Sequence, residues 1–179
     1  FEVFRSTVVP ELLASAPHRR LNIWSAACSS GQEAYTLAMV LAEHAVPQGR
    51  SVDILATDIS SAMLERTREG SYSQLEVNRG LPIASLMKHF DKRGTQWQVK
   101  EPLRAMVRTQ QLNLAAPFPP IGPFDLVFLR NVLIYFAADV KRQVLDRVRE
   151  VLRPDGYLFL GGSETTLTID DSWERVRLG

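Results

Sequence analysis

The stretch that most constrains the fold of this chain is L-N-I-W-S-A-A-C-S-S-G-Q-E, residues 21–33. Its apolar run, 21–27, predicts a strand buried on both faces, and the small residues 28–31 predict a tight loop before a helix that begins at Gln32 or Glu33. Such a unit presents unpaired N–H groups and the positive end of a helix dipole, so an anionic or polar ligand is expected above the loop. The pattern lacks the G-x-G-x-x-G fingerprint, and an ordinary strand-to-helix connection explains it equally well.

A second apolar run, residues 52–56, leads into Asp58 in the sequence V-D-I-L-A-T-D-I-S. In nucleotide-binding α/β folds, an acidic residue at the end of the second strand binds the two ribose hydroxyls, because one carboxylate can accept from both. The alternative role for Asp58 is to cap the helix predicted over residues 60–69. The loop and the acid together favour ribose binding.

Apolar strands alternate with amphipathic helices along the rest of the chain. The helix that follows the first loop carries an apolar stripe, and a second helix, 139–152, is ended by R-P-D-G and followed by an apolar strand at 157–161. Four such alternations predict an α/β fold with a mostly parallel, doubly wound sheet. Residues 1–15 have helical apolar spacing on both sides of Pro10 and predict a lid helix packed on the sheet.

A small insertion is expected around residues 70–112. Within it, 72–82 has no clear period, 83–90 resembles a short amphipathic helix, and 97–100 and 104–112 resemble short strands. A segment of this length between two core strands is an insertion or a cover, and such segments tend to carry specificity.

Polar residues follow two further strands at the edge where open parallel sheets bind ligands. Asn113 and Leu114 follow the third core strand, and Arg130, Asn131 and Tyr135 lie beyond the strand in F-D-L-V-F-L. Asn113 offers both a donor and an acceptor to an adenine edge, and capping a turn is an equally good alternative.

Two charged residues away from these strand ends also have two interpretations. Glu33 lies in the first turn of its helix, where a carboxylate stabilises the dipole, or it faces a cationic group of a ligand. Arg5 is by default a surface residue whose apolar stem packs on the protein.

The composition excludes several classes of protein. The 179 residues suit one domain, and a net charge of +1 from 21 basic and 20 acidic residues, without a block of like charge, gives no sign of nucleic-acid binding. Cys28 is the single cysteine, so a disulfide framework is excluded and a reducing, cytoplasmic location is expected. No apolar run approaches the roughly 20 residues of a membrane span. No metal is expected, because the histidines lack ligand spacing: His18, His44 and His89.

Five segments together resemble the CheR family, the glutamate methyltransferases of chemotaxis receptors. The segments are W-S-A-A-C-S-S-G-Q-E-A-Y, A-T-D-I-S, N-R-G-L-P, G-P-F-D-L-V-F-L-R-N-V-L-I-Y-F and L-R-P-D-G-Y-L-F-L-G-G-S-E. The resemblance implies a Rossmann-like class I methyltransferase fold, S-adenosylmethionine as methyl donor, and methyl-accepting chemoreceptors as partners of a monomer. It also implies that residues 1–179 are a methyltransferase domain, a fragment whose upstream helical domain and last strand lie outside the chain.

The resemblance carries roles to individual residues. It implies that Arg5 lies beside both donor and acceptor, and that Tyr135 stands at the methyl-transfer centre. The other residues that it places around the cofactor are Ala27, Gly31, Glu33, Asp58, Asn113, Leu114, Arg130 and Asn131. One departure is Phe1, which stands where the family has a threonine.

The chemistry agrees with these residue types. A glutamate side chain has a pKa of about 4.3, so the acceptor is already ionised at neutral pH and needs no general base. Catalysis then consists mainly of orienting the carboxylate, which an arginine and a tyrosine can do. The alternative from another class is a non-catalytic module that binds S-adenosylmethionine and serves a chemosensory pathway as a sensor or scaffold. A small-molecule methyltransferase is disfavoured by the motifs.

Overall fold

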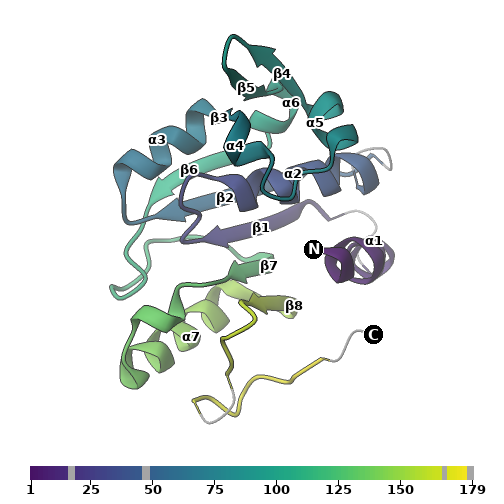
Figure 1. Cartoon of the computed structure of the whole chain (residues 1–179). Helices are drawn as coiled ribbons and strands as arrows, with labels where there is room; N and C mark the ends of the chain where they lie inside the picture. The colour runs from purple at the N-terminus through teal and green to yellow at the C-terminus, as the bar shows by residue number, and fades with distance from the viewer. Residues whose placement is uncertain (16–18, 46–48, 167–168, 177–179) are drawn as a thin grey trace.

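The computed structural model describes residues 1–15, 19–45, 49–166 and 169–176 (Figure 1). Its centre is a five-stranded sheet in the order β6-β2-β1-β7-β8, and every pair of neighbours is parallel. The strands are β1 (Leu21–Ala26), β2 (Val52–Asp58), β6 (Val107–Gln111), β7 (Phe124–Leu129) and β8 (Leu152–Leu160). The predicted parallel α/β sheet is therefore confirmed.

Helices cover both faces of this sheet (Figure 1). The helices are α1 (Val9–Ser15), which continues the short π-helix η1 (Phe4–Val8), α2 (Gln32–His44), α3 (Ser61–Glu69) and α7 (Ala138–Val151). Neighbouring strand residues point to opposite faces: Ile23 belongs to the core under α1, α2 and α3, and Trp24 belongs to the core under α7. This alternation makes the sheet doubly wound, as the sequence predicts.

The strand order reverses beside β1, because β2 lies on one side of it and β7 on the other. Ligands of open α/β sheets bind at such a point, beyond the carboxyl ends of the strands. The fold thus brings the segments after β1, β2 and β7 to one edge.

The insertion forms a separate three-stranded antiparallel sheet, β3-β5-β4, that lies beyond α2 and α3 (Figure 1). Its elements are β3 (Ser71–Ser73), α4 (Gln74–Val77), α5 (Ile83–His89), β4 (Phe90–Arg93), β5 (Gln96–Val99) and α6 (Glu101–Arg104). The helix over 83–90 and the strand over 97–100 are confirmed within a residue. The predicted strand over 104–112 starts too early, because Arg104 is the last residue of α6. The observed strand, β6, belongs to the main sheet and not to the insertion.

The sequence R-P-D-G follows the end of α7, as predicted, but it lies within the next strand, which begins earlier than the predicted 157–161. Strand β8 begins at Leu152, directly after α7, and contains Pro154 and Gly156. The β7–β8 register shifts between Phe124 and Leu126, where the pairing residue jumps from Leu152 to Tyr157, so the irregular residues are absorbed as a bulge of an edge strand.

Candidate active site at the carboxyl edge of the sheet

The loop between β1 and α2 is held in an unusual backbone conformation. Ala27, Ser29 and Gly31 have φ values of 56°, 51° and 85°. The Cys28 N–H donates to the carbonyl oxygen of Thr57 at 2.8 Å, which fastens the loop to the end of β2. Positive φ at two non-glycine residues is rare and costs free energy, so this conformation is maintained by its surroundings.

Gly31 is required by close packing as well as by its φ. A Cβ atom on Gly31 would lie 2.6 Å from Cγ2 of Thr67 in α3. Helix α2 begins at Gln32, as predicted, and no side chain caps its N-terminus. The first N–H groups of α2 therefore face the edge of the sheet without a side-chain acceptor.

Asp58 connects the end of β2 to this loop. One carboxylate oxygen accepts from the Ser29 N–H at 2.8 Å, and the other accepts from the Ser60 N–H at 2.9 Å. The capping alternative for Asp58 is wrong, because Ser60 caps α3 by accepting from the Met63 N–H. Each carboxylate oxygen of Asp58 keeps a lone pair that can accept from a ligand hydroxyl.

Glu33 joins three elements at the edge of the sheet. Its carboxylate accepts from the Ser25 hydroxyl at 2.8 Å and forms an ion pair with Arg130 at 3.0 Å. Burial raises the pKa of Glu33, and the bonds from Ser25 and Arg130 oppose that rise. Glu33 therefore does more than stabilise the helix dipole, because it also orients the guanidinium of Arg130, which follows β7.

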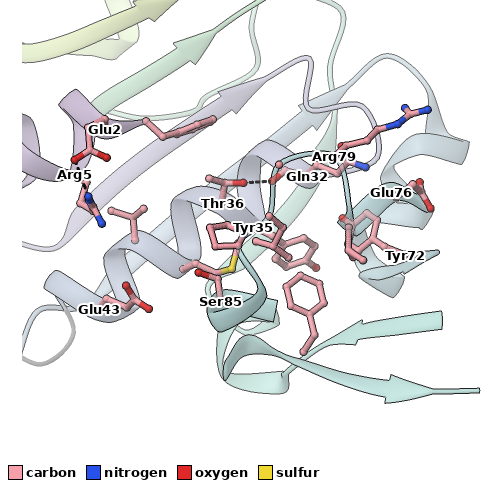
Figure 2. Close-up of a pocket in the computed structure, with 18 residues that line it drawn as sticks. Glu2, Arg5, Gln32, Tyr35, Thr36, Glu43, Tyr72, Glu76, Arg79 and Ser85 are labelled. Carbon is pink, nitrogen blue, oxygen red and sulfur yellow. Dashed lines mark hydrogen bonds and ion pairs between the residues drawn. The ribbon is translucent and has the colours of Figure 1, made fainter. Parts of the chain in front are cut away.

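Phe1 covers the same guanidinium. Its ring lies 5.1 Å from the Arg130 guanidinium carbon and stacks on Phe128 at 6.1 Å between centroids. Arg5 follows one helical turn later, and its own ion pair is with Glu2 at 2.7 Å. Figure 2 shows that Arg5 points along the outer face of α2 toward Glu43. The side chain of Arg5 pairs with Glu2, whereas Glu33 and Arg130 pair with each other.

The segment after β7 is held by a residue that the sequence analysis missed. The Glu164 carboxylate accepts four backbone hydrogen bonds at 2.6–2.9 Å, from Gly161, Asn131, Val132 and Leu133. Asn131 itself has a positive φ of 58°. The sequence signal that could have found Glu164 is its position in G-G-S-E, directly after the last strand, at the same edge of the sheet as the other candidate site residues.

Tyr135 ends the short 3-10 helix η3 (Leu133–Tyr135) in this segment. Its side chain is 79% exposed, and its hydroxyl has no hydrogen-bond partner among the described residues. The Tyr135 hydroxyl, in the segment after β7, is therefore accessible to a second molecule.

Asn113 and Leu114 follow β6. The Asn113 side-chain oxygen accepts from the Ala115 N–H at 3.0 Å, which confirms the turn-capping alternative. Leu114 is buried in the core under α7. The contact of this pair with an adenine stays a prediction.

Other chemistries find no support in the described residues. Burial raises the pKa of the Cys28 thiol to about 11, so it is protonated at neutral pH and is not a nucleophile. Within the described ranges, no group of three or more acidic, histidine or cysteine residues could hold a metal, and His18 lies outside those ranges. No described helix is both long and apolar enough to cross a membrane.

Comparison with solved structures shows which fold this is. The CcbJ methyltransferase of Streptomyces caelestis matches with a TM-score of 0.51 and 16% identity, over 89% of this chain and 48% of that one. The glycopeptide N-methyltransferase MtfA, complexed with sinefungin, matches with a TM-score of 0.50 and 14% identity, over 86% of this chain and 48% of that one. The fold is that of the class I S-adenosylmethionine-dependent methyltransferases.

Sequence comparison gives the family. Residues 1–178 match the family described as CheR methyltransferase, SAM binding domain, and the chain belongs to this family. Chemotaxis protein methyltransferase 1 of Pseudomonas aeruginosa is 44% identical, and chemotaxis protein methyltransferase Cher2 of Pseudomonas putida is 41% identical. In both cases the match covers 99% of this chain and 66% of the relative, so the chain spans slightly less than two thirds of their length.

Proposed function

We propose that this chain binds S-adenosylmethionine at the carboxyl edge of its sheet and transfers the methyl group to glutamate side chains of chemoreceptors, giving methyl esters. The observation that carries the proposal is the pair of anchored carboxylates, Asp58 on the loop and Glu33 on Arg130, in a member of this family. The names of the relatives, which are chemotaxis protein methyltransferases, support the receptor as acceptor.

The residues at this edge fit the cofactor. Asp58 keeps acceptor capacity for the ribose hydroxyls, and Ala27 and Gly31, both with positive φ, shape the loop that Asp58 holds. We assign Asn113 and Leu114 to the adenine and Glu33, Arg130 and Asn131 to the amino-acid end. Glu33 can receive an ammonium group, and Arg130 a carboxylate, because the two already pair as opposite charges.

The acceptor needs orientation more than activation. When bound, the sulfonium supplies its methyl group to an ionised carboxylate oxygen, and the S–C bond breaks as the O–C bond forms, with no net proton transfer. In this proposal Tyr135 donates to the acceptor carboxylate, and its exposure supports this role. Arg5 acts as the second orienting group once its guanidinium exchanges Glu2 for the acceptor.

The test measures binding and transfer separately. Calorimetry with S-adenosylhomocysteine reports the cofactor site, and transfer of labelled methyl from S-adenosylmethionine to a receptor fragment reports the activity. A matching fragment with glutamine at the accepting positions should receive no label. Binding of the nucleoside without transfer to any receptor fragment would instead identify a non-catalytic sensing or scaffolding module.

A further inference from the structure

A groove of about 410 Å³ follows the outer face of α2, between η1 and the insertion (Figure 2). We call it the α2 groove. Its volume suits a few side chains rather than a whole protein surface. Its walls are largely apolar and aromatic, and include Phe1, Tyr35, Met39, Tyr72, Leu81 and Phe90.

The α2 groove adjoins the candidate cofactor site at two points. Tyr72, which lines the groove, donates from its hydroxyl to the carbonyl oxygen of Ser30 in the β1–α2 loop at 2.7 Å. Phe1 lines the groove and also covers the guanidinium of Arg130. A molecule in the groove therefore lies beside the residues assigned to the cofactor.

The carboxylates of the groove are already paired. Each of the three has a cationic neighbour: Glu2 pairs with Arg5, Glu43 with Lys88, and Glu76 with Arg66. Glu43 also shares a hydrogen bond with His89. The pKa values of Glu43 and Glu76 are lowered by their hydrogen bonds, so both stay ionised in these pairs.

The cations of the groove are less fully paired. The Arg79 side chain makes no hydrogen bond or ion pair within the described part of the chain. At the opposite end in Figure 2, Arg5 is about half exposed and is neutralised by the more exposed Glu2. Exposed pairs of this kind exchange partners at little cost, so both ends of the groove favour an anionic ligand.

We propose that the α2 groove binds the acidic peptide segment that carries the accepting glutamate, with Arg79 pairing with a flanking carboxylate and the accepting carboxylate replacing Glu2 on Arg5. This inference rests on the proposed function and deepens it, because it assigns the surface that recognises the acceptor. The apolar walls then contact the side chains between the two carboxylates.

The test uses a labelled acidic peptide with one accepting glutamate, and the same peptide with its flanking acids changed to glutamine. Arg79→Glu is compared with Arg93→Glu, an exposed arginine of the same insertion that does not line the groove. Peptide binding to the protein loaded with S-adenosylhomocysteine is followed by fluorescence anisotropy. Charge reversal at Arg79 should weaken binding of the acidic peptide about tenfold or more, whereas reversal at Arg93 should change it less than about twofold. Arg79→Glu should also prefer a peptide with flanking lysines.

Equal effects of the two reversals, or no binding of the acidic peptide at all, would overturn this assignment of the groove. In methyl-transfer assays, Arg79→Glu should raise KM more than it lowers kcat. Failure of the unsubstituted protein to transfer methyl groups would count against the proposed function, and the anisotropy comparison would still decide the role of the groove.

Discussion

A carboxylate oxygen of Asp58, at the end of β2, lies 2.8 Å from the backbone nitrogen of Ser29, in the loop that follows β1. This bond joins two neighbouring strands where the sheet order reverses, so one side chain both shapes the loop and faces the ligand edge. Substitution of Asp58 therefore tests the loop and the ribose assignment together.

Asp58→Ala should weaken binding of S-adenosylhomocysteine at least about tenfold, which corresponds to about 1.4 kcal/mol. The physical reason is the loss of both the ribose acceptor and the bond to Ser29. Asp53→Ala is the matched control, because Asp53 lies near the opposite end of the same strand and pairs with Arg108 at 2.8 Å. Calorimetry should show unchanged affinity for Asp53→Ala, and equal losses in the two variants would contradict the site.

Tyr135→Phe should lower kcat for methyl transfer and leave the unfolding free energy within about 0.5 kcal/mol of the parent, since exposed side chains contribute little to stability. Tyr157→Phe is the comparison, because that hydroxyl donates to Glu11 at 2.8 Å, away from the strand ends. The measurement is single-turnover transfer to a receptor fragment. An unchanged rate in Tyr135→Phe would remove Tyr135 from the transfer centre.

Glu164→Gln should destabilise the segment that carries Arg130 and Asn131. An amide group replaces one carboxylate oxygen and turns its N–H groups toward backbone donors, so two of the four hydrogen bonds are lost. We expect a loss of about 1–3 kcal/mol in unfolding free energy and weaker nucleoside binding. Denaturant titration measures the unfolding free energy and calorimetry measures nucleoside binding. Glu174→Gln, at an exposed position, is the control. A fully stable Glu164→Gln protein would show that the carboxylate is dispensable.

Glu43 should contribute to the acid sensitivity of the fold. Hydrogen bonds from Lys88 and His89 lower its pKa, so its stabilisation is present above the unfolded value of about 4.3 and is lost as the pH falls through the lower folded value. The pair is partly exposed, so the contribution stays below about 1 kcal/mol. Glu43→Gln should flatten the fall of unfolding free energy between about pH 5 and pH 3, and the same slope as the parent would refute this.

The features that the sequence predicts well are those with a local cause. The apolar run of β1, the small residues of the loop and the start of α2 at Gln32 follow from neighbouring residues, and the parallel sheet follows from their repetition. R-P-D-G ends α7 as predicted, but the early start of β8 was not predictable from it, because an edge strand tolerates a proline and a bulge.

The contacts of the site depend on residues far apart in the sequence. The four donors to Glu164 come from two segments, and no local pattern predicts that they meet. For Arg5 the helical position is predictable from the sequence, but the ion pair of its side chain with Glu2 is not.

The start of the insertion meets the end of its antiparallel sheet, since the Val99 N–H, at the end of β5, donates to the carbonyl oxygen of Gly70 at 2.9 Å. An insertion closed in this way can change in length or composition without shifting β2 and β6, the main-sheet strands that precede and follow it. The insertion can therefore vary while Asp58, Glu33 and Arg130 keep their places at the carboxyl edge of the main sheet.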